Sequence, residues 1–218
     1  MSLKHKHCEH LPEGTVYGVL LNFVRERAIW SDRAEQAPYG GMPKAPVLYI
    51  KTANTFNPHG GAVALPSGVE ALEVGATLGL MLGEGASVDR VALFLDWSIP
   101  HEQFYRPAVK YKNLDGFLGI GASAVAWQGP PMLESLGVNV LVNQQQVQQV
   151  NWRDLYLGVP ELIQTLEEFT AFRAGDVLLL GLDCLADGSR PLARAGDRVT
   201  LKTQHGLVLE QTVLGVQA

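Results

Sequence analysis

Short apolar runs separated by turn-forming residues are the feature that most restricts what this chain can fold into. Each run has the length of a strand, and the first is rich in β-branched and aromatic residues; the runs span residues 14–22, 47–51, 77–82, 91–96 and 139–142. Few segments have helical character. Many short strands with few helices do not fit a doubly wound βαβ sheet. We therefore expect a β-rich α+β domain, built on a rolled mixed sheet.

Two segments of the chain predict helices. The first spans residues 25–36 and would stop at Pro38 and Gly40. The second begins at Pro160, a residue that suits the first helical position. Its apolar residues recur at helical spacing; they are Leu162, Ile163, Leu166 and Phe169.

A four-residue motif occurs twice near the C-terminal end. Residues 173–176 and 194–197 both have the sequence Arg-Ala-Gly-Asp, and an apolar or alternating run follows each of them. Gly-Asp pairs favour tight turns. We expect both turns to lead into strands of the same sheet.

Composition excludes several classes of protein. The 218 residues include 17 Lys and Arg against 22 Asp and Glu, a formal net charge of −5, which argues against sequence-independent nucleic-acid binding. No apolar run is long enough for a membrane span or a signal peptide. Cys8 and Cys184 make no disulfide scaffold, so we expect a reducing cytoplasm. Residues 1–13 are expected to be a flexible polar segment, followed by one domain over residues 14–218.

The densest group of reactive side chains falls within residues 96–121. Arg106, Lys110 and Lys112 have even spacing, so on an extended segment they would share one face. That face is either a docking surface for a di- or tricarboxylate or a solvated basic strand edge. His101 and Glu102 are either a proton-transfer pair or a loop histidine beside a surface glutamate.

Several motifs together resemble the fumarylacetoacetate hydrolase family over roughly residues 14–213. They are Asn22, the Pro-Val-Leu-Tyr-Ile-Lys run at 46–51, Gly83, Asp96-Trp97-Ser98, Lys112-Asn113-Leu114-Asp115-Gly116-Phe117, and the two Ala-Gly-Asp turns. Within the family, residues 98–117 are most similar to the N-terminal half of the bifunctional isomerase/decarboxylases of 4-hydroxyphenylacetate (homoprotocatechuate) degradation.

The resemblance implies a fold, a reaction and partners. The fold would be mixed sheets rolled into a barrel-like domain. The activity would be decarboxylation of 5-oxopent-3-ene-1,2,5-tricarboxylate, isomerisation of 2-hydroxyhepta-2,4-diene-1,7-dioate, or both. Magnesium or manganese would hold the 2-oxo acid and stabilise an enolate. The chain would form a homodimer, or a heterodimer with a paralogous subunit.

The sequence departs from the family pattern at the expected metal site. The two glutamates of the family's E-x-E motif fall on Gly75 and Thr77, which leaves Asp96 as a weak ligand, so metal binding by this chain is doubtful. Leu182 replaces a threonine of the T-G-T-P turn, and Glu26 replaces a histidine. These losses motivate an alternative, a non-catalytic partner of a metal-bearing paralogue.

The site prediction combines the residues with the resemblance. Catalytic roles fall to His101, Glu102 and Lys112. The predicted substrate-binding residues are Arg106, Lys110 and Lys51. Two alternatives stay open: Lys51 is equally explained by a structural ion pair, and Asp96 by its hydrogen bonds at a strand end.

Overall fold

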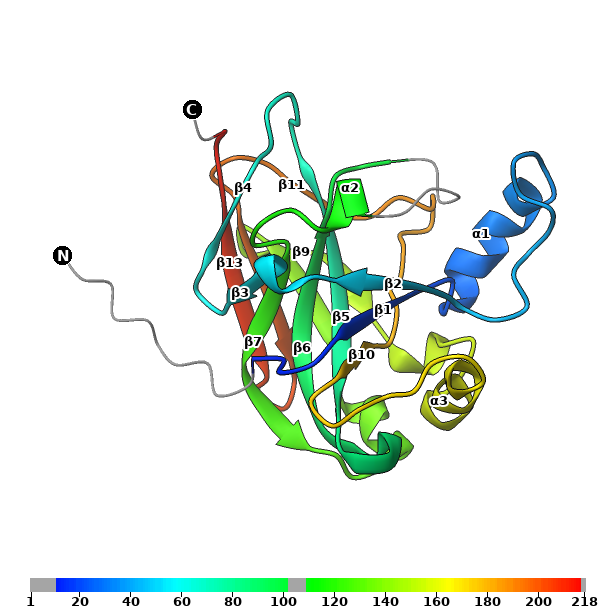
Figure 1. Cartoon of the computed structure of the whole chain (residues 1–218). Helices are drawn as coiled ribbons and strands as arrows, with labels where there is room; N and C mark the ends of the chain where they lie inside the picture. The colour runs from blue at the N-terminus through cyan, green and yellow to red at the C-terminus, as the bar shows by residue number, and fades with distance from the viewer. Residues whose placement is uncertain (1–10, 102–108, 217–218) are drawn as a thin grey trace.

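A computed structural model describes residues 11–101 and 109–216. Among them, strands form two sheets, and both sheets curl into a half-barrel (Figure 1). The larger sheet comprises β1 (Val16–Leu20), β2 (Val47–Lys51), β3 (Phe56–Pro58), β5 (Leu72–Leu82), β6 (Val88–Ser98), β7 (Leu118–Ala126), β10 (Val177–Leu179) and β11 (Leu192–Ala193). The smaller sheet comprises β4 (Ala62–Ala64), β8 (Val138–Val142), β9 (Gln145–Val150), β12 (Arg198–Thr203) and β13 (Val208–Leu214).

The larger sheet has the order β2-β1-β10-β5-β6-β7-β3, with β11 added to β5. Its pairing is mixed, because β1 runs parallel to β10 and β3 runs parallel to β7 while the other pairs are antiparallel. The smaller sheet has the order β4-β13-β12-β8-β9. The mixed, rolled architecture confirms the predicted β-rich α+β class.

Short helices connect and flank the strands. The α-helices are α1 (Val24–Ala34), α2 (Val109–Lys112) and α3 (Val159–Glu167), and the 3₁₀ turns are η1 (Ala53–Thr55), η2 (Glu84–Ala86), η3 (Pro130–Ser135) and η4 (Trp152–Asp154). Helix α1 projects from the sheets (blue, at the right of Figure 1). It buries few side chains, Glu26 and Ala34 among its own residues.

The long pair β5–β6 determines which side chains enter the site. Successive residues of a strand point to opposite faces. Val74, Leu95 and Trp97 enter the main apolar core. On the other face Gly75 lies opposite Asp96, and Glu73 lies opposite Ser98. Glu73, Thr77, Asp96 and Ser98 therefore lie on one face of the sheet.

The two Arg-Ala-Gly-Asp turns have the same local structure but serve different sheets. Asp176 Oδ2 accepts a hydrogen bond from the backbone N–H of Arg173 at 2.8 Å, and Asp197 Oδ2 accepts one from that of Arg194 at 2.7 Å. The first turn leads into β10 of the larger sheet and the second into β12 of the smaller one. The prediction of a single sheet is wrong, because long-range strand pairing, and not turn chemistry, chooses the sheet.

Two further local predictions are also wrong. Lys110 and Lys112 lie on the short helix α2, not on an extended segment, and residues two apart on a helix do not face the same side. Lys110 is exposed and Lys112 is buried. Phe169 lies beyond the end of α3 and is 62% exposed, whereas Leu162 and Leu166 are buried as predicted.

Candidate functional site

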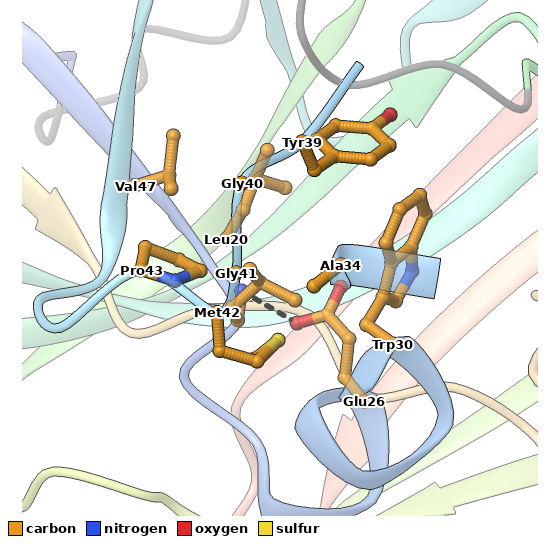
Figure 2. A pocket seen from close by; sticks show the side chains of 11 residues that line it. Leu20, Glu26, Trp30, Ala34, Tyr39, Gly40, Gly41, Met42, Pro43 and Val47 are labelled. Carbon is orange, nitrogen blue, oxygen red and sulfur yellow. Dashed lines mark hydrogen bonds between the residues drawn. The ribbon is translucent and has the colours of Figure 1, made fainter. Parts of the chain in front are cut away.

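A mostly apolar cavity of about 220 Å³ lies between α1 and the segment that joins it to β2 (Figure 2). Trp30, Tyr39 and Met42 contribute to its walls, and the side chain of Glu26 points into it. Glu26 is only 3% exposed, and its Oε2 accepts a hydrogen bond of 2.7 Å from the backbone N–H of Leu21. A charged side chain therefore borders an apolar space.

Glu26 also belongs to a buried cluster around Arg190. Arg190 Nη2 donates to Glu26 Oε1 at 2.6 Å, and Arg190 Nη1 lies 3.9 Å from Glu73 Oε2. Burial raises the pKa of the Glu26 carboxyl group, although Arg190 opposes this shift. The cluster joins α1, β5 and the segment before β11. Sequence reasoning missed Arg190, because a lone arginine between turn-forming residues carries no motif.

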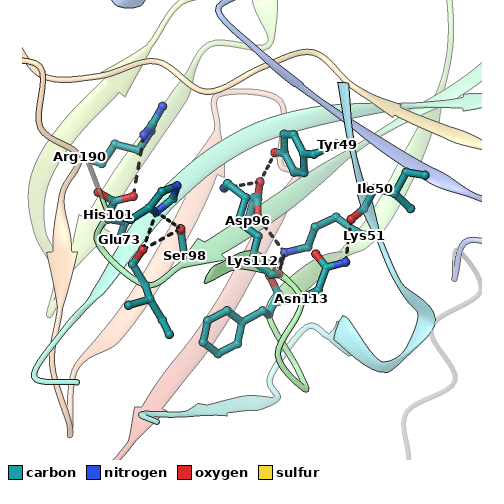
Figure 3. A network of polar contacts seen from close by, with 12 residues as sticks. Tyr49, Ile50, Lys51, Glu73, Asp96, Ser98, His101, Lys112, Asn113 and Arg190 are labelled. Carbon is teal, nitrogen blue, oxygen red and sulfur yellow. Dashed lines mark hydrogen bonds and ion pairs between the residues drawn. The ribbon is translucent and has the colours of Figure 1, made fainter. Parts of the chain in front are cut away.

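Asp96 is the centre of a second buried cluster (Figure 3). Its side chain has no exposed surface, and three side chains donate to its carboxylate. Lys51 Nζ lies 2.9 Å from Oδ1, Lys112 Nζ lies 3.0 Å from Oδ2, and the Tyr49 hydroxyl also donates to Oδ2. Both carboxylate oxygens are thus occupied by groups of the chain itself.

The local sequence explains how these residues meet. Tyr49 and Lys51 alternate on β2, so both point to the same side of the strand. Tyr49 packs across Gly18 of β1, where an added Cβ would lie 2.1 Å from the tyrosine ring. Because Gly18 has no side chain, the Tyr49 hydroxyl can reach Asp96. The sequence did not predict Tyr49 as a partner of Asp96.

Burial and the close cations set the charge states of this cluster. Burial alone would raise the pKa of Asp96, but Lys112, Lys51 and the Tyr49 hydroxyl lower it from 3.8 to about 2. Burial lowers the pKa of Lys51 from 10.5 to about 8, while the attraction of Asp96 opposes the shift. Burial and Asp96 raise the pKa of Tyr49 well above its ordinary value, so its hydroxyl keeps the proton it donates.

The two lysines differ in how many hydrogen bonds they make. An ammonium group has three donors. Lys51 uses them on Asp96 Oδ1, on the carbonyl oxygen of Lys112, and on that of Phe117 at 2.9 Å. Lys112 donates to Asp96, and its Nζ lies 5.0 Å from the centroid of the Tyr49 ring. Within residues 11–101 and 109–216 no second acceptor is found for Lys112 Nζ, so it keeps donors that a bound anion would need.

His101 follows the end of β6. Its Nδ1 lies 2.8 Å from the carbonyl oxygen of Ile99 and 3.4 Å from Ser98 Oγ. Because a carbonyl can only accept, the neutral ring carries its proton on Nδ1, and Nε2 is the nitrogen that can take up another. The ring stacks on Tyr111, with centroids 4.3 Å apart. Burial lowers the pKa of His101 below its ordinary value.

The structure brings together part of the predicted site. Lys51, Asp96 and Lys112 meet directly, and His101 contacts Ser98, which lies two residues beyond Asp96 on the same face of β6. Lys110 Nζ instead lies 5.8 Å from the Tyr111 ring centroid, on the exposed side of α2. The predicted residues Glu102 and Arg106 lie outside the described residues.

The residues around Asp96 do not fit magnesium or manganese. These cations prefer several oxygen ligands. At the two expected glutamate positions, Gly75 offers no side chain and the Thr77 hydroxyl donates to the carbonyl of Leu78 at 3.2 Å. Across residues 11–101 and 109–216, no group of three or more His, Cys, Asp and Glu could hold a metal ion.

Comparison with known proteins shows what the chain is similar to. Residues 15–214 match the model of the fumarylacetoacetate (FAA) hydrolase C-terminal family. The chain is 33% identical, over 212 residues, to the 4-hydroxyphenylacetate degradation bifunctional isomerase/decarboxylase of Salmonella dublin, a match that covers 93% of this chain and 47% of the relative. The homoprotocatechuate catabolism bifunctional isomerase/decarboxylase of Escherichia coli is 32% identical, with 93% and 48% covered. The chain thus spans about half the length of these curated relatives.

Solved structures with the same fold are more distant in sequence. The 5-carboxymethyl-2-hydroxymuconate delta-isomerase of Mycobacterium smegmatis has a TM-score of 0.75 at 18% identity, covering 95% of this chain and 81% of that one. The fumarylpyruvate hydrolase of Pseudomonas aeruginosa, solved with Mn²⁺ and pyruvate, has a TM-score of 0.72 at 19% identity, covering 94% and 90%. These likenesses confirm the predicted fold. In the part of the chain that the structure describes, no helix is long and apolar enough to cross a membrane.

Proposed function

The chain belongs to the fumarylacetoacetate hydrolase family, and from this premise we propose that it is one unit of an isomerase/decarboxylase of 4-hydroxyphenylacetate (homoprotocatechuate) catabolism. Its substrate would be an unsaturated oxo di- or tricarboxylate. The observation that carries the proposal is the 33% identity to a bifunctional enzyme of that pathway across 93% of this chain. The predicted reducing cytoplasm is part of the same proposal.

In the proposed reaction the chain's own cation stabilises an enolate. When the carboxylate of the tricarboxylate leaves as carbon dioxide, the electron pair of the broken carbon–carbon bond delocalises through the conjugated double bond onto the 5-oxo oxygen, and the resulting dienolate is then protonated on carbon. Lys112 Nζ would donate a hydrogen bond to that oxygen, where negative charge develops. The nearly complete burial of Lys112, 2% exposed, supports this role, because the attraction is stronger away from water.

Proton transfer in the isomerisation would use His101. Tautomerisation moves a proton between the 2-hydroxyl oxygen and a carbon of the diene, so one group must accept a proton and return it. The neutral ring with its proton on Nδ1 supports His101 Nε2 as that group. The roles predicted for Glu102, Arg106 and Lys110 stay part of the proposal. For Lys51, whose three donors all have protein acceptors, the geometry favours a structural role.

The direct test is turnover of 5-oxopent-3-ene-1,2,5-tricarboxylate by the purified chain, followed as loss of the substrate's ultraviolet absorbance with and without magnesium. We expect turnover that falls at least about tenfold in His101→Asn. The matched control is Lys202→Met, which replaces an exposed lysine on β12. Absence of turnover in both conditions, also after addition of a paralogous unit, would overturn the catalytic proposal.

A second candidate function is a non-catalytic partner of a metal-bearing paralogue. Two observations favour it: the carboxylate of Asp96 is occupied by the chain's own side chains, and the curated relatives are about twice as long as the matched segment. Co-expression with a paralogue that has an intact E-x-E motif tests it. The partner function predicts a stable complex. It fails if the paralogue is fully active alone and never co-purifies with this chain.

A further inference from the structure

We propose that the Asp96 cluster has a resident cation in place of a divalent metal: Lys112 Nζ, fixed by Asp96, binds the carboxylate of a 2-oxo acid without any metal ion. The inference rests on the proposed function for the class of anion. It goes further in assigning the binding to one ammonium group and in excluding a metal from that step.

The charges around Asp96 do not cancel one another. Two ammonium groups lie within 3.0 Å of the oxygens of one carboxylate, so Asp96, Lys51 and Lys112 together carry an excess positive charge. A divalent cation at the same oxygens would meet two like charges at short range, in an interior where repulsion is strong. An anion would instead be attracted. The charge of this cluster therefore favours a carboxylate and disfavours a metal.

Close packing leaves no room for a side chain at position 75. An ideal Cβ at Gly75 would lie 2.6 Å from the backbone oxygen of Asp96, and 2.9 Å from Cδ2 of Leu182. A glutamate at position 75 would therefore collide with its neighbours. Gly75 stands at the position of a family glutamate, and Leu182 at that of a family threonine. The leucine side chain packs into the space that the missing side chain at position 75 leaves. This packing keeps a carboxylate from position 75, so a metal ion would lack one of the oxygen ligands that it needs.

Lys112 differs from the buried cations Lys51 and Arg190 in its hydrogen-bond partners. The three donors of Lys51 all have protein acceptors. Arg190 is engaged by Glu26 at 2.6 Å and lies close to Glu73, so carboxylates already surround it. Lys112 makes its hydrogen bond to Asp96 and is otherwise oriented over the Tyr49 ring. Among the buried cations of the described residues, Lys112 thus donates to a single carboxylate and keeps two ammonium donors, whereas the one unpaired donor of Arg190, its Nε, belongs to a guanidinium group that Glu26 already holds.

The test measures binding of oxalate, a dianion that mimics a 2-oxo acid, by isothermal titration calorimetry of the whole chain. The titration is done once in EDTA and once in magnesium chloride, with Mn²⁺ electron paramagnetic resonance as a separate measure of metal binding. We expect the two oxalate Kd values to agree within about twofold. We also expect that adding the chain causes no saturable loss of the free Mn²⁺ signal. Lys112→Met should weaken oxalate binding at least tenfold, whereas Lys202→Met should leave it unchanged.

Lys112→Arg keeps the result interpretable if Lys112→Met fails to fold, because it retains a cation beside Asp96. We expect this variant to bind oxalate within about tenfold of the unmodified chain. The inference is overturned if magnesium tightens oxalate binding more than tenfold, if Mn²⁺ binds, if oxalate does not bind at all, or if Lys112→Met binds normally. Metal-independent oxalate binding without turnover of the tricarboxylate would sustain the inference while the proposed catalytic function fails.

Discussion

Leu182 occupies the space beside Gly75 that any side chain at position 75 would need. A Cβ on Gly75 would approach Leu182 Cδ2 to 2.9 Å and Cδ1 to 3.2 Å. Leu182 is 1% exposed, so it has little freedom to move away. The two residues come from β5 and from the segment that follows β10, and their fit links two positions where the chain departs from its family.

This fit predicts coupled effects on stability. Gly75→Ala should lower the free energy of unfolding by about 1–3 kcal/mol through overpacking, and Leu182→Ala by about 2–5 kcal/mol through the cavity it leaves. The double variant should lose less than the sum, because the cavity relieves the contact of the added methyl group with Leu182, although its 2.6 Å approach to the backbone oxygen of Asp96 stays. Urea denaturation of all four proteins measures the cycle. Gly40→Ala, with no atom within 4 Å of the new Cβ, is the control; strict additivity would contradict the coupling.

Asp96 should be far more important for stability than a surface carboxylate. Asp96→Ala leaves two buried ammonium groups without their counter-ion, which should cost about 3–5 kcal/mol. Glu134→Ala removes a partner of Arg153 at 2.6 Å, but these side chains are 58% and 70% exposed. That loss should stay within about 1 kcal/mol. Guanidinium denaturation at pH 7 compares the variants, and similar losses would contradict the structural role of Asp96.

Stability should fall on the acid side through Asp96. Its pKa is about 2 in the folded chain against an ordinary value of 3.8. Because the folded value is the lower one, the stabilisation is complete above the unfolded pKa and is lost as pH falls toward 2. The loss amounts to about 2 kcal/mol. Denaturation from pH 6 downward should show the difference between the unmodified chain and Asp96→Asn shrinking over this range; a constant difference would contradict the assignment.

His101 should be neutral at pH 7 with its proton on Nδ1. Burial lowers its pKa, and the Ile99 carbonyl holds the Nδ1 proton. Long-range ¹H–¹⁵N spectra of labelled protein identify the tautomer, with His101→Asn used for assignment. The ring should titrate below its ordinary pKa of 6.5, and any turnover should decrease as pH falls through the same midpoint. A ring protonated on Nε2 would contradict the proposed base.

Local sequence signals predicted many of the elements. The apolar run at 47–51 is β2, and the proline-started helix is α3, because strand composition and helical spacing act over a few residues. The Arg-Ala-Gly-Asp turns formed as predicted, since each aspartate closes its own turn. The family motifs also identified Asp96, Lys51 and Lys112 as residues of interest, without showing that they touch.

The sequence by itself determined the β-rich class, the turns and the family, because these depend on local chemistry and on motif identity. Tertiary structure alone decided that Tyr49, Lys51 and Lys112 converge on one carboxylate, and that Arg190 joins Glu26 to Glu73. The partners of Asp96 lie 47, 45 and 16 positions away along the chain. Such contacts follow from strand register and sheet curvature, which no short stretch of residues encodes.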